Sequence, residues 1–174
     1  MATRKLNLGA GDQKIDGFIS VDLYDEAADV RADICELPFE DNSVDEIVAY
    51  QVIEHVPYQL SEAMFSEMYR VLKPGASAIV ETPDVDYIAS KIIQEGLKPK
   101  WIFSLVGEYY RPWDKDRYED WENNAASIHR NPWNYDRIVH VATTAGFKKF
   151  RRQGMDEKHP DYRYPETLSV QLTK

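Results

Sequence analysis

Two glycines and an aspartate near the start of the chain have the residue types and spacing of a cofactor-binding turn. In the stretch KLNLGAGDQKIDGFISVDLY (5–24), two apolar runs flank the turn Gly9–Ala10–Gly11, and the second run ends in Asp22. Glycine permits a tight turn and lets a ligand approach the backbone with no Cβ in the way. A carboxylate at the end of a strand can accept hydrogen bonds from both hydroxyls of a ribose. The pattern therefore indicates a nucleoside-containing cofactor, although a G-x-G turn alone can also be purely structural.

The spacing does not match that of a nicotinamide dinucleotide site. That fingerprint requires a third glycine at position 14, where the chain has Lys14. It also places its ribose-binding acid about 20 residues further along, whereas Asp22 follows Gly11 much sooner. A nicotinamide-dependent oxidoreductase is therefore the disfavoured alternative.

A second acid follows the next apolar run. Asp33 ends the weak strand predicted at 29–34, where its carboxylate can accept a hydrogen bond from an adenine amino group. The backbone N–H of Ile34 can serve a ring nitrogen, and Leu23 and Ile34 are apolar enough to enclose the base. Both acids have a structural alternative: Asp22 can cap the end of a strand, and Asp33 can be a solvated loop acid.

Strand-like and helical segments alternate along the chain. Strands are predicted at 4–8, 18–23, 29–34, 44–53, 76–82, 147–153 and 166–173, and helices at 61–72, 84–94 and 135–145, the last capped by Asn134 and closed by Gly146. This alternation predicts a parallel sheet covered on both faces, and ligands bind such sheets beyond the carboxyl ends of the strands. The last two strands have no helix between them, which predicts an antiparallel hairpin.

Bulk composition restricts the function classes. Hydrophobic residues make up 43% of the 174 residues, which suits a globular protein. No apolar run approaches the ~20 residues of a membrane span, and the first residues lack the features of a signal peptide. The net charge of −9 argues against nucleic acid as a main partner. A single cysteine, Cys35, excludes an internal disulfide and fits a cytoplasmic protein. We expect a monomer or homodimer with no membrane partner.

Six ordered motifs between residues 6 and 75 resemble the class I S-adenosylmethionine-dependent methyltransferases. The stretches that carry the resemblance are NLGAG, GFISVD, ADICELPF, SVDEI, EH and RVLKPG, and they are similar to those of a small branch of predicted methyltransferases. The resemblance implies an α/β, Rossmann-like, doubly wound and mostly parallel seven-stranded sheet. It also implies an antiparallel last strand, helices on both faces and a single domain over residues 1–174.

The same resemblance implies a function. This branch is associated with polysaccharide or surface-glycan functions, so we expect transfer of a methyl group to a small-molecule or sugar/glycan acceptor. The alternative is a catalytically inactive protein that binds S-adenosylmethionine or S-adenosylhomocysteine in a regulatory role.

The resemblance also assigns residues to the cofactor, S-adenosyl-L-methionine. They lie at the ends of the first four predicted strands: Asn7, Gly9, Ala10, Gly11, Asp22, Leu23, Asp33, Ile34, Tyr50 and Gln51. For Tyr50 a place in the core is the alternative. No metal site is expected.

Two histidines are the candidate catalytic residues. Methyl transfer is an in-line displacement, so alignment of the reactants is the main requirement. A general base is needed only if the acceptor is a hydroxyl or a protonated amine, and a histidine pKa near ~6.5 suits that role. His55 follows the fourth strand in IEHV, and His129 precedes the last helix in SIHRNPW. A histidine that is merely hydrogen-bonded in a loop is the structural alternative.

The segment 97–133 breaks the alternation of strands and helices. It contains all four tryptophans and several tyrosines, and long insertions in compact domains are usually lids or binding loops. We expect an aromatic cap on the acceptor side of the cofactor, with a satellite core beneath a long loop as the alternative. At least one ring should line the acceptor pocket among Trp101, Tyr109, Tyr110, Trp113 and Trp133.

Overall fold

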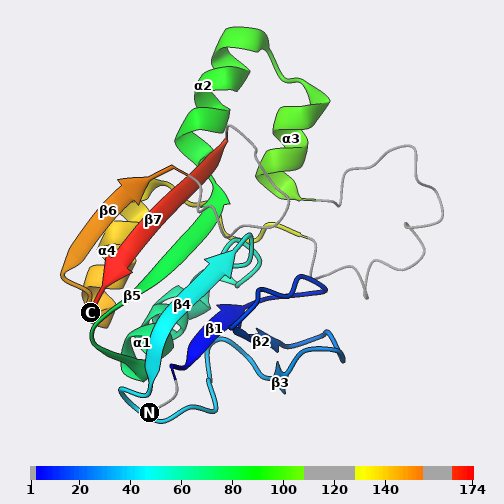
Figure 1. Cartoon of the computed structure of the whole chain (residues 1–174). Helices are drawn as coiled ribbons and strands as arrows, with labels where there is room; N and C mark the ends of the chain where they lie inside the picture. Colours follow the sequence, from blue (N-terminus) through cyan, green and yellow to red (C-terminus); the bar gives the residue numbers. More distant parts are fainter. Residues whose placement is uncertain (1–2, 108–127, 155–165) are drawn as a thin grey trace.

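A seven-stranded sheet organises the protein, shown as a computed structural model in Figure 1. The structure describes residues 3–107, 128–154 and 166–174. The strands are β1 (Lys5–Leu8), β2 (Ile19–Asp22), β3 (Val30–Arg31), β4 (Val44–Tyr50), β5 (Leu72–Pro83), β6 (Lys149–Gln153) and β7 (Thr167–Thr173). Their order is β3-β2-β1-β4-β5-β7-β6, and β7 runs antiparallel to both of its neighbours. The predicted sheet, with its seven strands and one antiparallel strand, is confirmed.

Two of the described helices begin at a side-chain cap. The helical elements are the 3₁₀ turn η1 (Tyr58–Leu60) and the α-helices α1 (Ser61–Val71), α2 (Val85–Glu95), α3 (Pro99–Val106) and α4 (Tyr135–Ala145). The Asp84 carboxylate accepts from the N–H of Asp86 at the start of α2, and the Asn134 side chain accepts from the N–H of Arg137 at the start of α4. These bonds satisfy N–H groups that have no partner inside a helix.

The main core lies between the sheet and one helical layer. Helices α1 and α4 pack against each other, and their apolar faces share one buried cluster with the strands. On the opposite face of the sheet, Ile15 and Phe18 from the loop after β1 pack on Val48, Tyr50 and Ile79. A loop takes this place because the connection from β1 to β2 is too short for a helix of ordinary length. The two faces are therefore covered differently in the described part of the chain.

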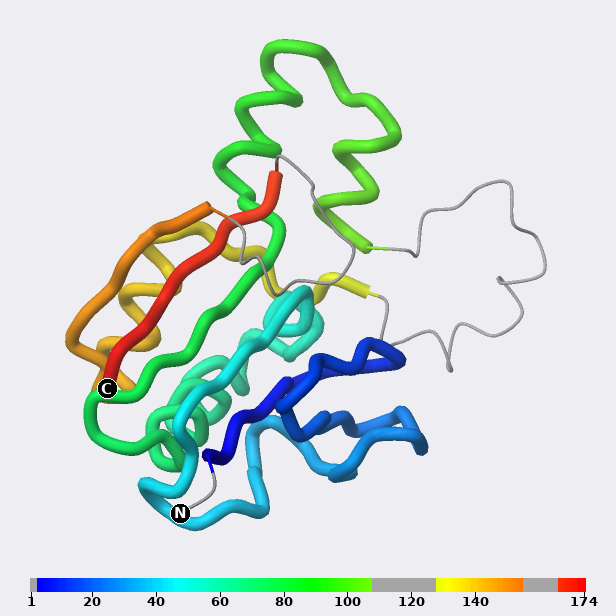
Figure 2. The backbone as a smooth tube through the Cα atoms, viewed as in Figure 1, coloured from blue at the N-terminus to red at the C-terminus, as the bar shows by residue number. Residues whose placement is uncertain are grey.

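Helices α2 and α3 project beyond the end of β5 as a pair, which is clear in the backbone tube of Figure 2. Trp101 of α3 is buried, and its ring lies edge-on to that of Tyr87 of α2, with ring centres 6.2 Å apart. Among the described helices, none has both the length and the apolar character that crossing a bilayer requires.

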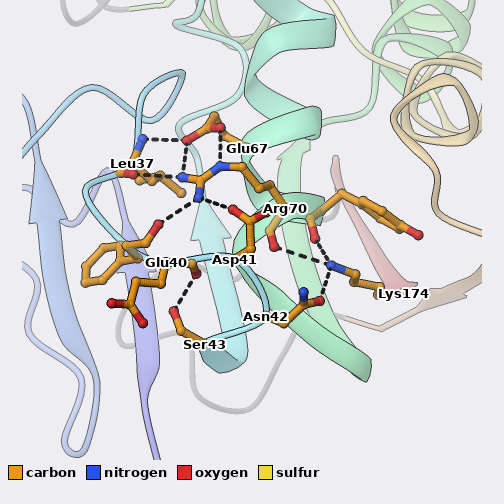
Figure 3. Close-up of polar contacts among 10 residues, drawn as sticks. Leu37, Glu40, Asp41, Asn42, Ser43, Glu67, Arg70 and Lys174 are labelled. Atoms are coloured by element: carbon orange, nitrogen blue, oxygen red, sulfur yellow. Dashed lines mark hydrogen bonds and ion pairs between the residues drawn. The ribbon is translucent and has the colours of Figure 1, made fainter.

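A polar cluster around Arg70 fastens the loop at 37–43 to α1 (Figure 3). The guanidinium donates two hydrogen bonds to the Glu67 carboxylate and one to Asp41. It also donates to the backbone carbonyls of Leu37 and Phe39, while Glu67 accepts from the N–H of Leu37. Because two of the acceptors are main-chain atoms, Arg70 fixes the path of the loop itself.

Candidate active site

A large cavity lies where the strand order reverses, between β1 and β4. Its volume is about 520 Å³, within the range of small-molecule sites. It is lined by Gly9, Gly11, Asp22, Leu23, Tyr24, Asp25, Asp33, Ile34, Cys35, Gln51, Val52, His55, Val56, Pro57, Leu60 and Arg130. We call it the switch-point cavity. Open parallel sheets bind their ligands at this place.

The two glycines of the first turn have different roles. Gly9 has φ +64°, and a Cβ there would overlap the side chain of Val52, so this glycine lets the turn pack against the end of β4. Gly11 has φ +51°, and a Cβ there would meet nothing within 4 Å. The missing side chain of Gly11 therefore leaves open space in the cavity.

Asp22 holds the two loops that flank the cavity. One carboxylate oxygen, Oδ2, accepts from the N–H of Gly11 at 2.9 Å, and Oδ1 accepts from Tyr24 at 2.8 Å and Asp25 at 3.0 Å. Burial acts to raise the pKa of Asp22, but these backbone donors outweigh it and hold the pKa below its ordinary value. An ionised carboxylate has about four acceptor positions, so one remains on Oδ2 for a ligand.

Another part of the cavity wall is built from the segment that follows β3. Asp33 accepts from the N–H of Cys35 at 2.8 Å, which forms a tight turn, and Ile34 presents a buried apolar side chain. Burial, with the neighbouring Asp33 carboxylate, raises the pKa of the Cys35 thiol to about 12. This wall leads into the loop that Arg70 holds.

The chain bends sharply after β4. Gln51 has φ +50°, which is uncommon for a residue other than glycine, and its N–H donates to the carbonyl of Glu81 at 2.8 Å. Such a conformation costs on the order of 1–3 kcal/mol and is typical of functional sites. The bend carries Gln51, Val52 and His55 into the lining of the switch-point cavity.

Three of the residues expected at the cofactor do not line the switch-point cavity. Asn7 is buried and donates from its side chain to the carbonyl of Gln13, and Ala10 is buried beside the cavity without lining it. Tyr50 packs with Val48 and Ile79 on the far face of β4, because alternate residues of a strand point to opposite faces. The remaining expected residues all line the switch-point cavity.

The two candidate catalytic histidines are in contact. The ring centres of His55 and His129 lie 5.0 Å apart at an interplanar angle of 71°. His55 lines the switch-point cavity, whereas His129 lines a smaller cavity behind it together with Glu54. Burial and the nearby His55 lower the pKa of His129 to about 4, and burial raises the pKa of Glu54 to about 8.

Neither described tryptophan of the aromatic segment lines the switch-point cavity. Trp133 is fully buried, and its indole N–H donates to the carbonyl of Ile53 at 3.1 Å. Trp101 packs between α2 and α3. Tyr109, Tyr110, Trp113, Tyr118 and Trp121 lie outside the described residues.

Several cavity residues carry no motif by which sequence reasoning could find them. Tyr24, Leu60 and Arg130 line the cavity from the bend after β2, from η1 and from the segment before α4. The backbone N–H groups of Arg130 and Asn131 donate to the carbonyl of Glu54, which brings the 128–133 segment against the end of β4. Contacts between segments so far apart in the chain leave no local pattern in the sequence.

Part of the chain is similar in sequence to known methyltransferases. Residues 12–80 match the family described as "Methyltransferase domain". A probable S-adenosylmethionine-dependent methyltransferase from Mycolicibacterium smegmatis is 45% identical over 74 residues, which cover 35% of this chain and 28% of that protein. A sterol 24-C-methyltransferase from Pneumocystis carinii is 40% identical over 53 residues, covering 30% of this chain and 14% of that protein. The matches thus span less than a third of either relative's length.

A solved structure extends the similarity to the whole fold. An S-adenosylmethionine-dependent methyltransferase from Archaeoglobus fulgidus superposes with a TM-score of 0.62 at 13% identity, covering 99% of this chain and 86% of that one. Residues 12–80 of this chain thus resemble a methyltransferase domain in sequence, and the chain as a whole shares its fold with a solved S-adenosylmethionine-dependent methyltransferase.

Proposed function

We propose that the switch-point cavity binds S-adenosyl-L-methionine and that the protein transfers its methyl group to a small-molecule or sugar acceptor. The observation that carries the proposal is the placement of Asp22, Gly11 and Ile34 around one cavity at the point where the strand order reverses. The resemblance of the motifs and the match of residues 12–80 to the methyltransferase domain family support it.

The residues present fit this cofactor. Asp22 keeps one acceptor position for a ribose hydroxyl, and the space left by Gly11 admits the part of the ligand nearest the first turn. Asp33 and the backbone of Ile34 would hold the adenine, and the side chains of Leu23 and Ile34 would enclose it. Gln51 would lie toward the methionine part.

When bound, the cofactor supplies an electrophilic methyl group on a sulfonium. The protein must then align an acceptor with that group and exclude water from it. The apolar lining from Val52, Val56 and Leu60 serves the exclusion of water. Arg130 supplies a cation at the same cavity, which favours an acceptor that carries a carboxylate, a phosphate or sugar hydroxyls. The segment 97–133 would cap this side.

His55 is the better placed of the two candidate bases, because it lines the switch-point cavity while His129 lies behind it. The Nδ1 of His55 lies 3.1 Å from the carbonyl oxygen of Ile128. A carbonyl oxygen only accepts, so Nδ1 carries the proton, and in the neutral ring Nε2 is the basic nitrogen. His129 would then act as a positioning residue.

Calorimetry with S-adenosylmethionine, S-adenosylhomocysteine and NAD tests the cofactor. We expect binding of the first two only, and binding of NAD alone would overturn the proposal. Transfer of a labelled methyl group over a panel of sugars and small acids then tests the reaction. Cofactor binding without turnover on any acceptor would favour the non-catalytic alternative.

The role of His55 has its own test once an acceptor is known. His55→Gln should lower turnover by roughly 10²–10⁴-fold with little change in cofactor affinity, whereas the exposed His140→Gln should change neither. Unchanged turnover in His55→Gln would exclude it as the base.

We further propose that the protein acts in the cytoplasm as a monomer or homodimer, with no nucleic-acid partner. The single cysteine and the net charge of −9 support this. Light scattering on the purified protein and cell fractionation would test it, and a larger assembly or a membrane fraction would contradict it.

A further inference from the structure

Behind the switch-point cavity lies a small cavity with an unusual excess of hydrogen-bond acceptors. Its volume is about 10 Å³, room for about one water-sized body. Glu54, Thr82, Asn131 and His129 line it. Both carboxylate oxygens of Glu54, the Asn131 Oδ1 and the Thr82 hydroxyl oxygen are buried and have no hydrogen-bond partner among the described residues. Buried polar atoms are normally paired, so this cavity is built for something that satisfies acceptors.

The Thr82 hydroxyl can donate one hydrogen bond to these acceptors and a water can donate two, but neither supplies a charge opposite the Glu54 carboxylate. The Glu54 carboxylate is only 2% exposed and has no ion-pair partner among the described residues. A cation satisfies several such acceptors at once and supplies the missing charge.

The two histidines complete a ligand set. One ligating atom each of Glu54, His55 and His129 lie within 4.8 Å of one another. The Nδ1 atoms of both histidines lie 3.1 Å from backbone carbonyl oxygens, those of Ile128 and Ser104. These bonds fix the tautomer so that each neutral ring has its lone pair on Nε2. Histidines that bind metals are commonly held in this way by the other ring nitrogen.

We propose that Glu54, His55 and His129 form a binding site for a divalent transition-metal ion such as Zn²⁺. Two imidazoles and one carboxylate favour such ions over Mg²⁺, which prefers oxygen ligands. Tetrahedral Zn²⁺ with bonds of about 2.1 Å holds its ligands roughly 3.4 Å apart. Closing the cluster from its present width requires side-chain movements on the order of 1 Å, which rotation of the Glu54 carboxylate and the imidazoles can supply.

The position of the site gives it a use beyond the proposed function. His55 lines the switch-point cavity while Glu54 and His129 lie behind it, so the ion would sit in the wall between the two cavities. Its open coordination positions would face an acceptor oxygen and lower the pKa of that oxygen. His55 would then be a ligand, and the ion would replace it as the activating group.

The test uses the full chain, freed of metal with a chelator, and needs no cofactor. Titration calorimetry with ZnCl₂ and with MgCl₂ should show one Zn²⁺ site and much weaker binding of Mg²⁺. His129→Gln should weaken the Zn²⁺ site by at least about 100-fold, whereas His140→Gln, which removes an exposed histidine of α4, should leave it unchanged.

Glu54→Gln provides a second variant that is expected to fold, because it removes a buried charge and keeps the shape. It should also lose the site, and the shift of its thermal unfolding by Zn²⁺ should disappear. Absence of Zn²⁺ binding to the wild type, or equal binding to wild type and His129→Gln, would overturn the proposal. Equal or tighter binding of Mg²⁺ would overturn the assignment to a transition metal.

Discussion

The carboxylate of Asp22 should contribute one hydrogen bond to the cofactor, and Asp22→Ala measures it. The Asp22 Oδ1 already accepts hydrogen bonds from two backbone N–H groups, and Oδ2 accepts from one. One acceptor position on Oδ2 therefore remains for a ribose hydroxyl. A hydrogen bond to a charged group is worth roughly 1.5–3 kcal/mol. The dissociation constant of S-adenosylhomocysteine should therefore rise by about 10- to 150-fold. If Asp22 bonded both ribose hydroxyls, this dissociation constant would rise by roughly 150-fold or more.

The assay must separate this bond from a disturbance of the loops. We would measure S-adenosylhomocysteine and its 2′-deoxy and 3′-deoxy analogues by calorimetry on wild type and variant. In the wild type one deoxy analogue should bind about 10- to 150-fold more weakly than the parent. In Asp22→Ala that preference should vanish, because the hydroxyl has lost its partner.

Asp29→Ala is the matched control. Asp29 also accepts from a backbone N–H and a hydroxyl, both of Ser20, but it does not line the cavity. It should leave the ratio between parent and deoxy ligand unchanged. If Asp22→Ala keeps the wild-type ratio, Asp22 does not contact the ribose and our assignment of the cavity fails.

Three further predictions follow from the surroundings of the cavity. Because the pKa of Cys35 is raised to about 12 by burial and Asp33, alkylation of the folded protein by iodoacetamide at pH 8 should be about 10³-fold slower than that of a free cysteine. The folded state also retains a proton that the unfolded state loses, so the free energy of unfolding should fall as the pH rises from about 9 toward 12. Rapid alkylation of the folded protein would contradict both expectations. Arg70→Met removes the hydrogen bonds that fasten the loop at 37–43 and should lower the free energy of unfolding by about 2–4 kcal/mol. The melting temperature should then fall by roughly 5–15 °C. A decrease in the free energy of unfolding below about 1 kcal/mol would mean that the cluster is not stabilising. Gly9→Ala should unfold more easily than Gly11→Ala, because the new methyl group would overlap the Val52 side chain, its Cβ included. A second change, Val52→Gly, should rescue only Gly9→Ala, so denaturant curves without such a rescue would refute the packing role of Gly9.

Much of the fold could be predicted because its signals are local. Apolar runs, the glycine turn and the capping residues Asp84 and Asn134 each act over a few neighbouring positions. The position of Tyr50 could also have been read from strand alternation: Val48 and Tyr50 share one face, and Ile47 and Ala49 share the other.

Other parts of the site depend on contacts between distant segments. The pairing of His55 with His129, and the hold of Arg70 on the carbonyls of Leu37 and Phe39, join residues that no periodicity relates. The backbone donors that occupy Asp22 depend on the exact path of two loops. Such features follow only when the fold has brought the segments together.

The place of β7 in the sheet has a consequence for how the protein is made. β7 lies between β5 and β6, and its register pairs Ser77 with Thr173 and Pro83 with Thr167. While the ribosome has not yet released residues 167–173, β5 has an exposed edge and β6 has no partner strand among the described residues. Contacts of such long sequence separation form slowly, and an open apolar edge invites aggregation. The edge of β5 is therefore open to association with other chains until β7 pairs with it.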